Sequence, residues 1–105
     1  MNSRETSDPS DTVSSATAAT TIDNDRVRVT TWTFKEPGDS TGQHRHEHDY
    51  IVIPVTGGQL VVTRPDGTSS DLTQVAAVAY LGTAGTTHTV TAMHPLAFVE
   101  IELKT

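Results

Sequence analysis

The sequence has 105 residues, a net charge of −6 with histidine counted as neutral, and no cysteine. The length accommodates one domain, and the acidic balance disfavours nucleic acid and anionic membrane surfaces as partners. The lack of cysteine excludes disulfides, iron–sulfur clusters and thiol nucleophiles. Neither a signal peptide nor an apolar run of the roughly 20 residues that a membrane helix needs is evident, so we expect a cytoplasmic protein.

The first segment, residues 1–21, is dominated by Ser, Thr, Asp and Ala and has no aromatic residue. Such a composition does not bury enough apolar surface to offset the entropy lost on ordering. We therefore expect a disordered N-terminal tail, or alternatively an arm that becomes ordered against a partner subunit. The folded domain is then expected to span residues 22–105.

Short segments rich in β-branched and aromatic residues recur along the rest of the chain and are bounded by Gly, Pro or Asp. No stretch shows helical periodicity, and strands that recur every ~8–12 residues favour an all-β sandwich or barrel. The predicted strands are residues 27–34, 49–55, 60–63, 75–81, 88–91 and 96–103.

Alternation within two of these segments predicts which side chains face the core. Glu100 and Glu102 alternate with apolar residues, which predicts that they form the solvent side of an edge strand. Trp32 and Phe34 are expected to be core residues, with a pocket lining as the alternative.

All five histidines lie between residues 44 and 94, and His44, His46 and His48 occupy alternate positions. Alternate residues of an extended strand share one face, so these imidazoles are expected to lie close together, as in a metal site. His48 has two interpretations, a further metal ligand or a histidine at the mouth of the barrel. His94, just before Pro95, is expected to be a loop histidine.

The spacing around these histidines resembles the first motif of the cupin superfamily, G-x5-H-x-H-x3-E-x6-G. Every spacing is kept, and the one substitution is a tyrosine in place of the glutamate; the aligned residues are Gly38, His44, His46, Tyr50 and Gly57. The second motif, G-x5-P-x-G-x2-H-x3-N, is matched only at Gly85 and His88.

The resemblance implies a double-stranded β-helix, the jelly-roll barrel of the cupins. It also implies that His44, His46 and His88 bind one divalent transition metal ion, Fe, Mn, Ni or Zn, inside the barrel. Tyr50 occupies the position of the usual glutamate ligand, and a neutral phenol is a poor ligand. Either His48 replaces that carboxylate, or the site keeps three histidines and Tyr50 acts as a catalytic hydrogen-bond donor or acid–base group.

The expected function is metal-dependent catalysis on a small-molecule substrate, with a dioxygenase, an isomerase and a lyase as the candidate reaction classes. A non-catalytic module that binds or senses a metal or ligand is the alternative, followed by a structural barrel with vestigial histidines. Because a domain of this size buries only about 60% of its unfolded surface, we also expect a homodimer.

Overall fold

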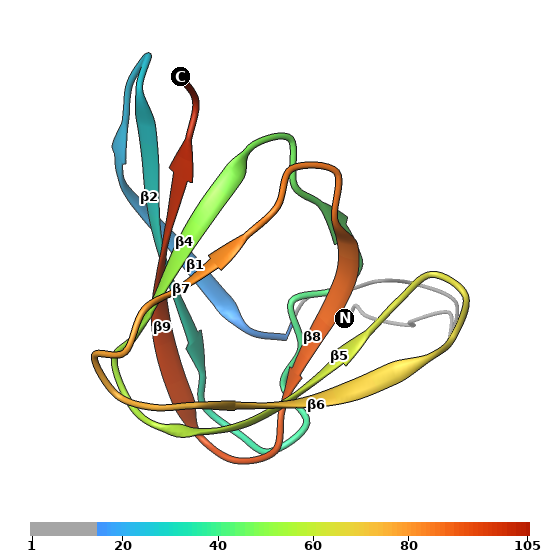
Figure 1. Cartoon of the computed structure of the whole chain (residues 1–105). Helices are drawn as coiled ribbons and strands as arrows, with labels where there is room; N and C mark the ends of the chain where they lie inside the picture. The colour runs from blue at the N-terminus through green and yellow to red at the C-terminus, as the bar shows by residue number, and fades with distance from the viewer. Residues whose placement is uncertain (1–14) are drawn as a thin grey trace, which may run out of the picture.

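The computed structural model describes residues 15–105 and consists of two antiparallel β-sheets that face each other across the interior (Figure 1). The first sheet has the strand order β1-β2-β9-β4-β7 and the second β3-β8-β5-β6. No helix that could span a membrane is present among these residues. The strands are β1 (Thr17–Asp23), β2 (Val27–Phe34), β3 (His44–Arg45), β4 (Asp49–Pro54), β5 (Gly58–Thr63), β6 (Ser69–Gln74), β7 (Tyr80–Gly82), β8 (Thr87–Ala92) and β9 (Leu96–Leu103).

The prediction of an all-β domain is confirmed, and β2 and β9 have the predicted bounds. The predicted strand at residues 75–81 is wrong, because the chain leaves the second sheet after β6 and enters the first at β7. Ala77 has a positive φ of 67°, and the backbone N–H of Val78 donates to Val75 over 3.0 Å. The apolar run therefore encodes a turn between sheets, with Val75 and Val78 more than half exposed.

Strand β1 corrects the predicted start of the folded domain. Thr17 to Thr20 were expected in a tail, but they pair with β2, beginning with Thr17 opposite Thr33. Every residue of β1 is exposed, so this segment buries little apolar surface, as its composition predicts. Backbone hydrogen bonds to β2 hold it as an exposed edge strand. Residues 1–14 of the predicted tail lie outside the described residues.

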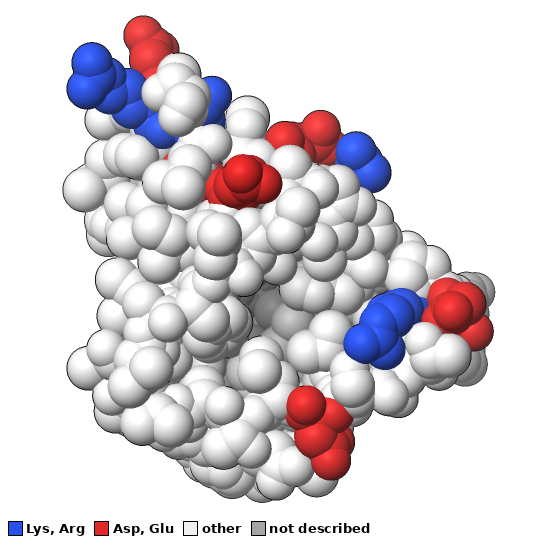
Figure 2. Space-filling model, viewed as in Figure 1, with Lys and Arg blue, Asp and Glu red and all other residues white. Residues whose placement is uncertain are grey.

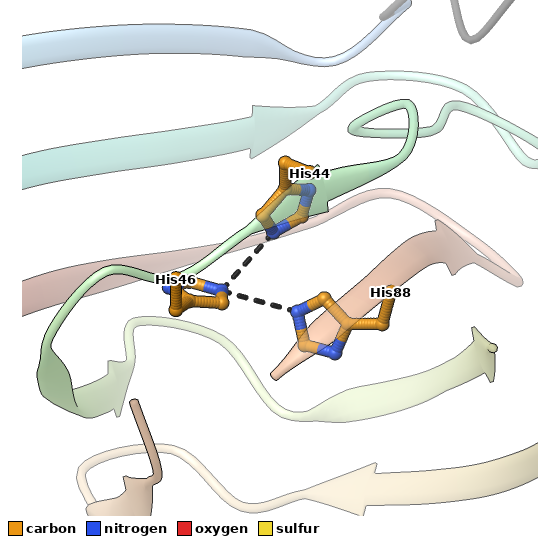
Figure 3. Close-up of side chains that lie close together, drawn as sticks. All are labelled: His44, His46 and His88. Atoms are coloured by element: carbon orange, nitrogen blue, oxygen red, sulfur yellow. Dashed lines mark hydrogen bonds between the residues drawn. The ribbon is translucent and has the colours of Figure 1, made fainter. Parts of the chain in front are cut away.

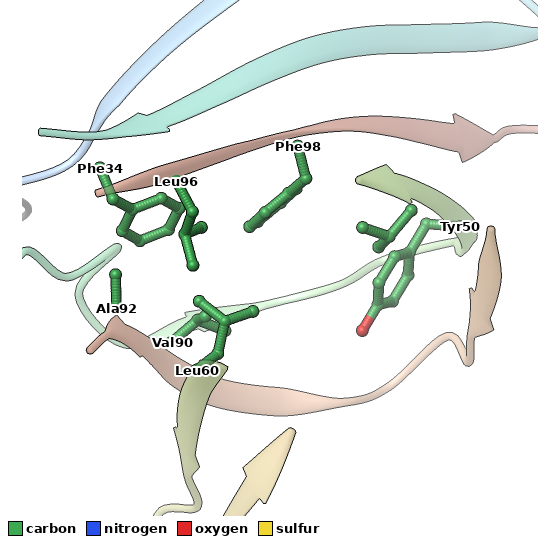
Figure 4. Packing of buried hydrophobic residues seen from close by; sticks show 8 residues of the cluster. Phe34, Tyr50, Leu60, Val90, Ala92, Leu96 and Phe98 are labelled. Carbon is green, nitrogen blue, oxygen red and sulfur yellow. The ribbon is translucent and has the colours of Figure 1, made fainter. Parts of the chain in front are cut away.

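The core lies between the sheets, and its side chains come from both (Figure 4). The rings of Phe34 and Phe98 pack against each other, with their centroids 5.6 Å apart. Tyr50 lies at the opposite end of the cluster from Phe34. Phe34 is thus a core residue as predicted, and Trp32 is partly buried against the same cluster. The buried apolar residues are Phe34, Tyr50, Val52, Leu60, Val90, Ala92, Leu96 and Phe98.

The prediction that Glu100 lies on the solvent side of an edge strand is wrong. β9 is the middle strand of its sheet, with β2 on one side and β4 on the other. Phe98 and Glu100 share the inward face and are 4% and 8% exposed. Glu102 has the same parity and is half-buried at the end of the strand, where it meets Arg28.

Candidate metal centre

Three histidines from β3, from the residue that follows it and from β8 converge inside the barrel (Figure 3). His44 of β3 is paired directly with His88 of β8, and His46 follows the end of β3. The backbone of His46 is fixed on both sides, since its N–H donates to Thr86 and its carbonyl accepts from Gly85, both over 2.8 Å. The nearest ring nitrogens of the three histidines lie within 4.8 Å of one another.

The hydrogen-bond chemistry of this cluster fits a metal ion. Nε2 of His46 lies 3.1 Å from Nε2 of His44 and 3.2 Å from Nε2 of His88. Nδ1 of His44 donates to the carbonyl of Gly42 over 3.0 Å, which leaves its Nε2 with a free lone pair. A ring nitrogen carries either one hydrogen or one lone pair, so Nε2 of His46 satisfies at most one of its two contacts. A cation among the nitrogens satisfies all three lone pairs at once.

Burial keeps two of these imidazoles neutral, the form that binds metals. It lowers the pKa of His46 to about 4, with repulsion from the charged forms of His44 and His88 adding to the effect. Burial, followed by repulsion from His44, also lowers the pKa of His88 to about 4. Arg45, between the first two histidines, has a side chain that is 58% exposed and lies beside Glu47.

These depressed pKa values predict how the stability of the metal-free protein depends on pH. Below its ordinary pKa of 6.5 His46 takes up a proton in the unfolded chain, whereas in the folded chain it does so only near pH 4. The contribution of His46 to stability is therefore lost as the pH falls from 6.5 towards 4, by roughly 2 to 3 kcal/mol. In urea unfolding, the stability of the protein relative to that of His46→Gln should decline over this range. A constant difference would contradict the depressed pKa.

Tyr50 packs its ring against that of His46. The two rings stack with centroids 3.7 Å apart and an interplanar angle of 15°, and Tyr50 is 6% exposed. Its ring also covers Gly82, its partner across β4 and β7. Burial, together with the negative charge of Glu100, raises the pKa of Tyr50 to about 12. The phenol thus stays protonated and is able to donate a hydrogen bond.

The structure separates the remaining two histidines from the cluster. His48 is half-exposed in the connection between β3 and β4 and is not one of the three clustered histidines. The alternation argument does not extend to it, because β3 ends at Arg45. A role of His48 as a fourth ligand stays a prediction. His94 is an exposed loop residue as predicted, and its Nε2 accepts a hydrogen bond from the backbone of Gln59 over 3.1 Å.

Glu100 is the residue at this site that the sequence analysis missed. Its Oε2 lies 3.9 Å from Nε2 of His46, and its side chain is 11% exposed. Burial raises its pKa to about 7, with the charge of Glu102 adding to this and a hydrogen bond from Trp32 opposing it. The sequence contains one signal that Glu100 is buried. Leu96 and Phe98 have the same parity as Glu100, so the strand face that was assigned to solvent also carries two large apolar residues.

A cavity of about 190 Å³ opens beside the histidines. Its polar lining includes His44, His88, Tyr50 and Glu100. In the view of Figure 2 the middle of the molecule is hollowed, and the atoms around the hollow belong to residues other than Lys, Arg, Asp and Glu. The apolar lining comes from both sheets and includes Trp32, Val52, Leu60, Val62, Leu72 and Phe98.

Comparison with known proteins relates this arrangement to one fold family. No family model matches the chain. A protein of Pseudomonas aeruginosa named β-alanine degradation protein BauB is 45% identical over 85 residues, which cover 79% of this chain and 87% of the relative.

Solved structures show the same relationship. A cupin domain from Bordetella pertussis has a TM-score of 0.79 and 41% identity, and the match covers 86% of this chain and 94% of that one. A Klebsiella pneumoniae protein described as having a double-stranded β-helix domain has a TM-score of 0.67 over 85% of this chain and 76% of that one. It is 17% identical, so it shows the shared fold alone. The predicted double-stranded β-helix is confirmed, and the chain belongs to the cupin superfamily as one of its small members.

Proposed function

We propose that this cupin binds one divalent transition metal ion through His44, His46 and His88 and acts on a small molecule in the adjoining cavity. The convergence of three Nε2 atoms beside a cavity that His44 and His88 line carries the proposal. A divalent ion held by three neutral imidazoles keeps a charge of +2 and open coordination positions, which suit it to bind an anionic substrate and polarise its carbonyl group. Iron, manganese, nickel and zinc all accept imidazole ligands.

The cavity limits the substrate to a small compound. Its volume of about 190 Å³ is below the ~300–1,000 Å³ typical of pockets for drug-sized ligands. The name of the Pseudomonas relative assigns that protein to the degradation of β-alanine, a small carboxylate. We therefore propose a small carboxylate or carbonyl compound as the substrate, with its charged end towards the histidines and its carbon chain against Trp32 and Phe98. The Tyr50 hydroxyl donates a hydrogen bond to it.

Ligand binding with and without metal tests this function. The tag-free protein is loaded separately with Fe(II), Mn(II), Ni(II) or Zn(II) and titrated calorimetrically with a panel of short carboxylates and keto acids. We expect at least one compound to bind only to the loaded protein and to be converted, as followed by mass spectrometry and oxygen uptake. Binding without conversion would favour the non-catalytic module instead. Equal binding to loaded and metal-free protein would contradict the proposed role of the metal.

We also propose a homodimer, for which an exposed apolar surface is the support. Val55, Val75 and Val78 are each more than half exposed, and the backbone N–H of Ala77 donates to Pro54 over 2.9 Å, which holds the two segments together. Light scattering on a sizing column should give about twice the chain mass of 11.2 kDa, and Val78→Lys should shift the mass towards that of one chain. A single-chain mass for the unmodified protein at micromolar concentration would contradict the dimer.

A further inference from the structure

Among the described residues, Glu100 is the acidic side chain that lines the cavity beside the three histidines, and the motif comparison does not account for it. We propose that Glu100 of β9 is the acidic ligand of the metal centre and supplies the carboxylate that the chain lacks at position 50. The inference rests on the proposed function, since it requires that the histidines bind a metal ion. It assigns the fourth ligand to a different strand from that of the motif.

Glu100 and His46 satisfy the distance requirement for a shared metal, whereas the group of donor atoms within 4.8 Å of one another consists of the three histidines. Two atoms that bind the same ion lie no further apart than twice the metal–ligand distance, about 4.2 Å for nitrogen and oxygen ligands of zinc. Oε2 of Glu100 lies 3.9 Å from Nε2 of His46. Glu100 also lines the same cavity as His44 and His88. The carboxylate therefore lies beside His46 and faces the same cavity as the other two histidines.

The pairing of β4 with β9 explains how a carboxylate at position 100 takes the place of one at position 50. Tyr50 and Val52 of β4 both point inward, and β9 places Glu102 opposite Tyr50 and Glu100 opposite Val52. Glu100 is thus a diagonal neighbour of Tyr50 on the adjacent strand, within the reach of a long side chain. The ring of Tyr50 is packed between His46 and Gly82. A glutamate on β9 therefore reaches the interior space next to the ring.

Within the part of the chain that the structure describes, no Lys or Arg side chain pairs with this carboxylate. Among residues 15–105, His46 is the only ion-pair partner of Glu100, whereas Arg28 pairs with Asp23 at 3.3 Å and with Glu102 at 3.2 Å. His46 is kept neutral by burial, so Glu100 has the hydrogen bond from Trp32 but no cationic partner. A buried carboxylate without a cation is costly, and such groups are usually paired with a cation or coordinate a metal. A divalent ion on the histidines supplies the missing positive charge, and Glu100 in turn reduces the net charge of the centre from +2 to +1.

The test compares Glu100→Gln with Glu102→Gln, which removes the same charge from the same strand face. Co(II) and Zn(II) affinities are measured by competition with a chromophoric chelator, and the Co(II) absorption spectrum reports the ligand set. We expect Glu100→Gln to bind each metal about 10- to 100-fold more weakly and to have a changed Co(II) spectrum. Glu102→Gln should stay within about threefold of the unmodified protein and keep its spectrum. Equal affinities and spectra for the two variants would overturn the assignment.

A second measurement needs no variant and covers the case in which Glu100→Gln does not fold. The infrared difference spectrum of the unmodified protein, with and without Zn(II), should show a shifted carboxylate band. If the protein binds Zn(II) but the carboxylate band does not shift, Glu100 is not a ligand. The proposal that the three histidines bind the metal would still stand. If the unmodified protein binds no metal at all, the proposed function fails together with this inference.

Discussion

Replacement of His88 by alanine is expected to abolish retention of the metal ion against a mild chelator. His88 is the only ligand candidate on β8, and without it the two remaining histidines come from the short β3 segment alone. The loss should exceed the roughly 10- to 100-fold that removal of a hydrogen-bond partner of a metal ligand costs. Equilibrium dialysis followed by elemental analysis measures it.

His94→Ala is the matched control, because it removes an imidazole that lies in an exposed loop outside the cluster. It should retain the metal content of the unmodified protein. His48→Ala tests the alternative ligand: a loss as large as that for His88→Ala would make His48 part of the centre. Full occupancy of the His88→Ala protein would place the metal site elsewhere in the chain.

Replacement of Gly82 by alanine is expected to destabilise the protein by roughly 1 to 3 kcal/mol and to weaken metal binding as well. A Cβ at this position would overlap the outer atoms of the Tyr50 ring, which is buried and stacked on His46. Gly82 has no positive φ, so its backbone accepts alanine and the overlap with the ring is the cost. Urea unfolding gives the change in stability, and chelator competition gives the change in affinity.

Tyr50→Leu removes the ring atoms that the new methyl group would overlap, so it should rescue the stability of Gly82→Ala. A double-mutant cycle should therefore give a coupling of about 0.5 to 3 kcal/mol. Gly67→Ala is the comparison, because a Cβ there meets no atom within 4 Å and only the φ of +89° opposes it. Its cost should be the same with either residue at position 50. Additive effects of Gly82→Ala and Tyr50→Leu would contradict the account of the Tyr50 ring.

The sequence predicts the all-β fold well, because the signals that specify it are local. Turn residues and β-branched segments determine β2 and β9, whose bounds agree with the prediction. The convergence of His44, His46 and His88 was predicted from the motif spacing and is present in the structure. Their role as ligands stays a prediction, as does that of Tyr50 in catalysis.

Features that depend on strand order were missed, because order within a sheet is not a local property. Glu100 alternates with apolar residues in the way an exposed edge strand does, but β9 is the middle strand of its sheet. The pairing of β1 with β2 through backbone hydrogen bonds is likewise independent of side-chain composition, so Thr17 to Thr21 gave no apolar signal. His48 was grouped with its neighbours by parity, which fails where β3 ends at Arg45.

Anomalous X-ray scattering from a crystal of the metal-loaded, tag-free protein tests the three-histidine centre most directly. Data collected on either side of the metal absorption edge locate the ion without reference to any proposed site. We expect one anomalous peak per chain, about 2.0–2.2 Å from Nε2 of His44, His46 and His88. A peak at His48 or His94 instead, or no ordered peak in crystals whose metal content is one ion per chain, would contradict the account.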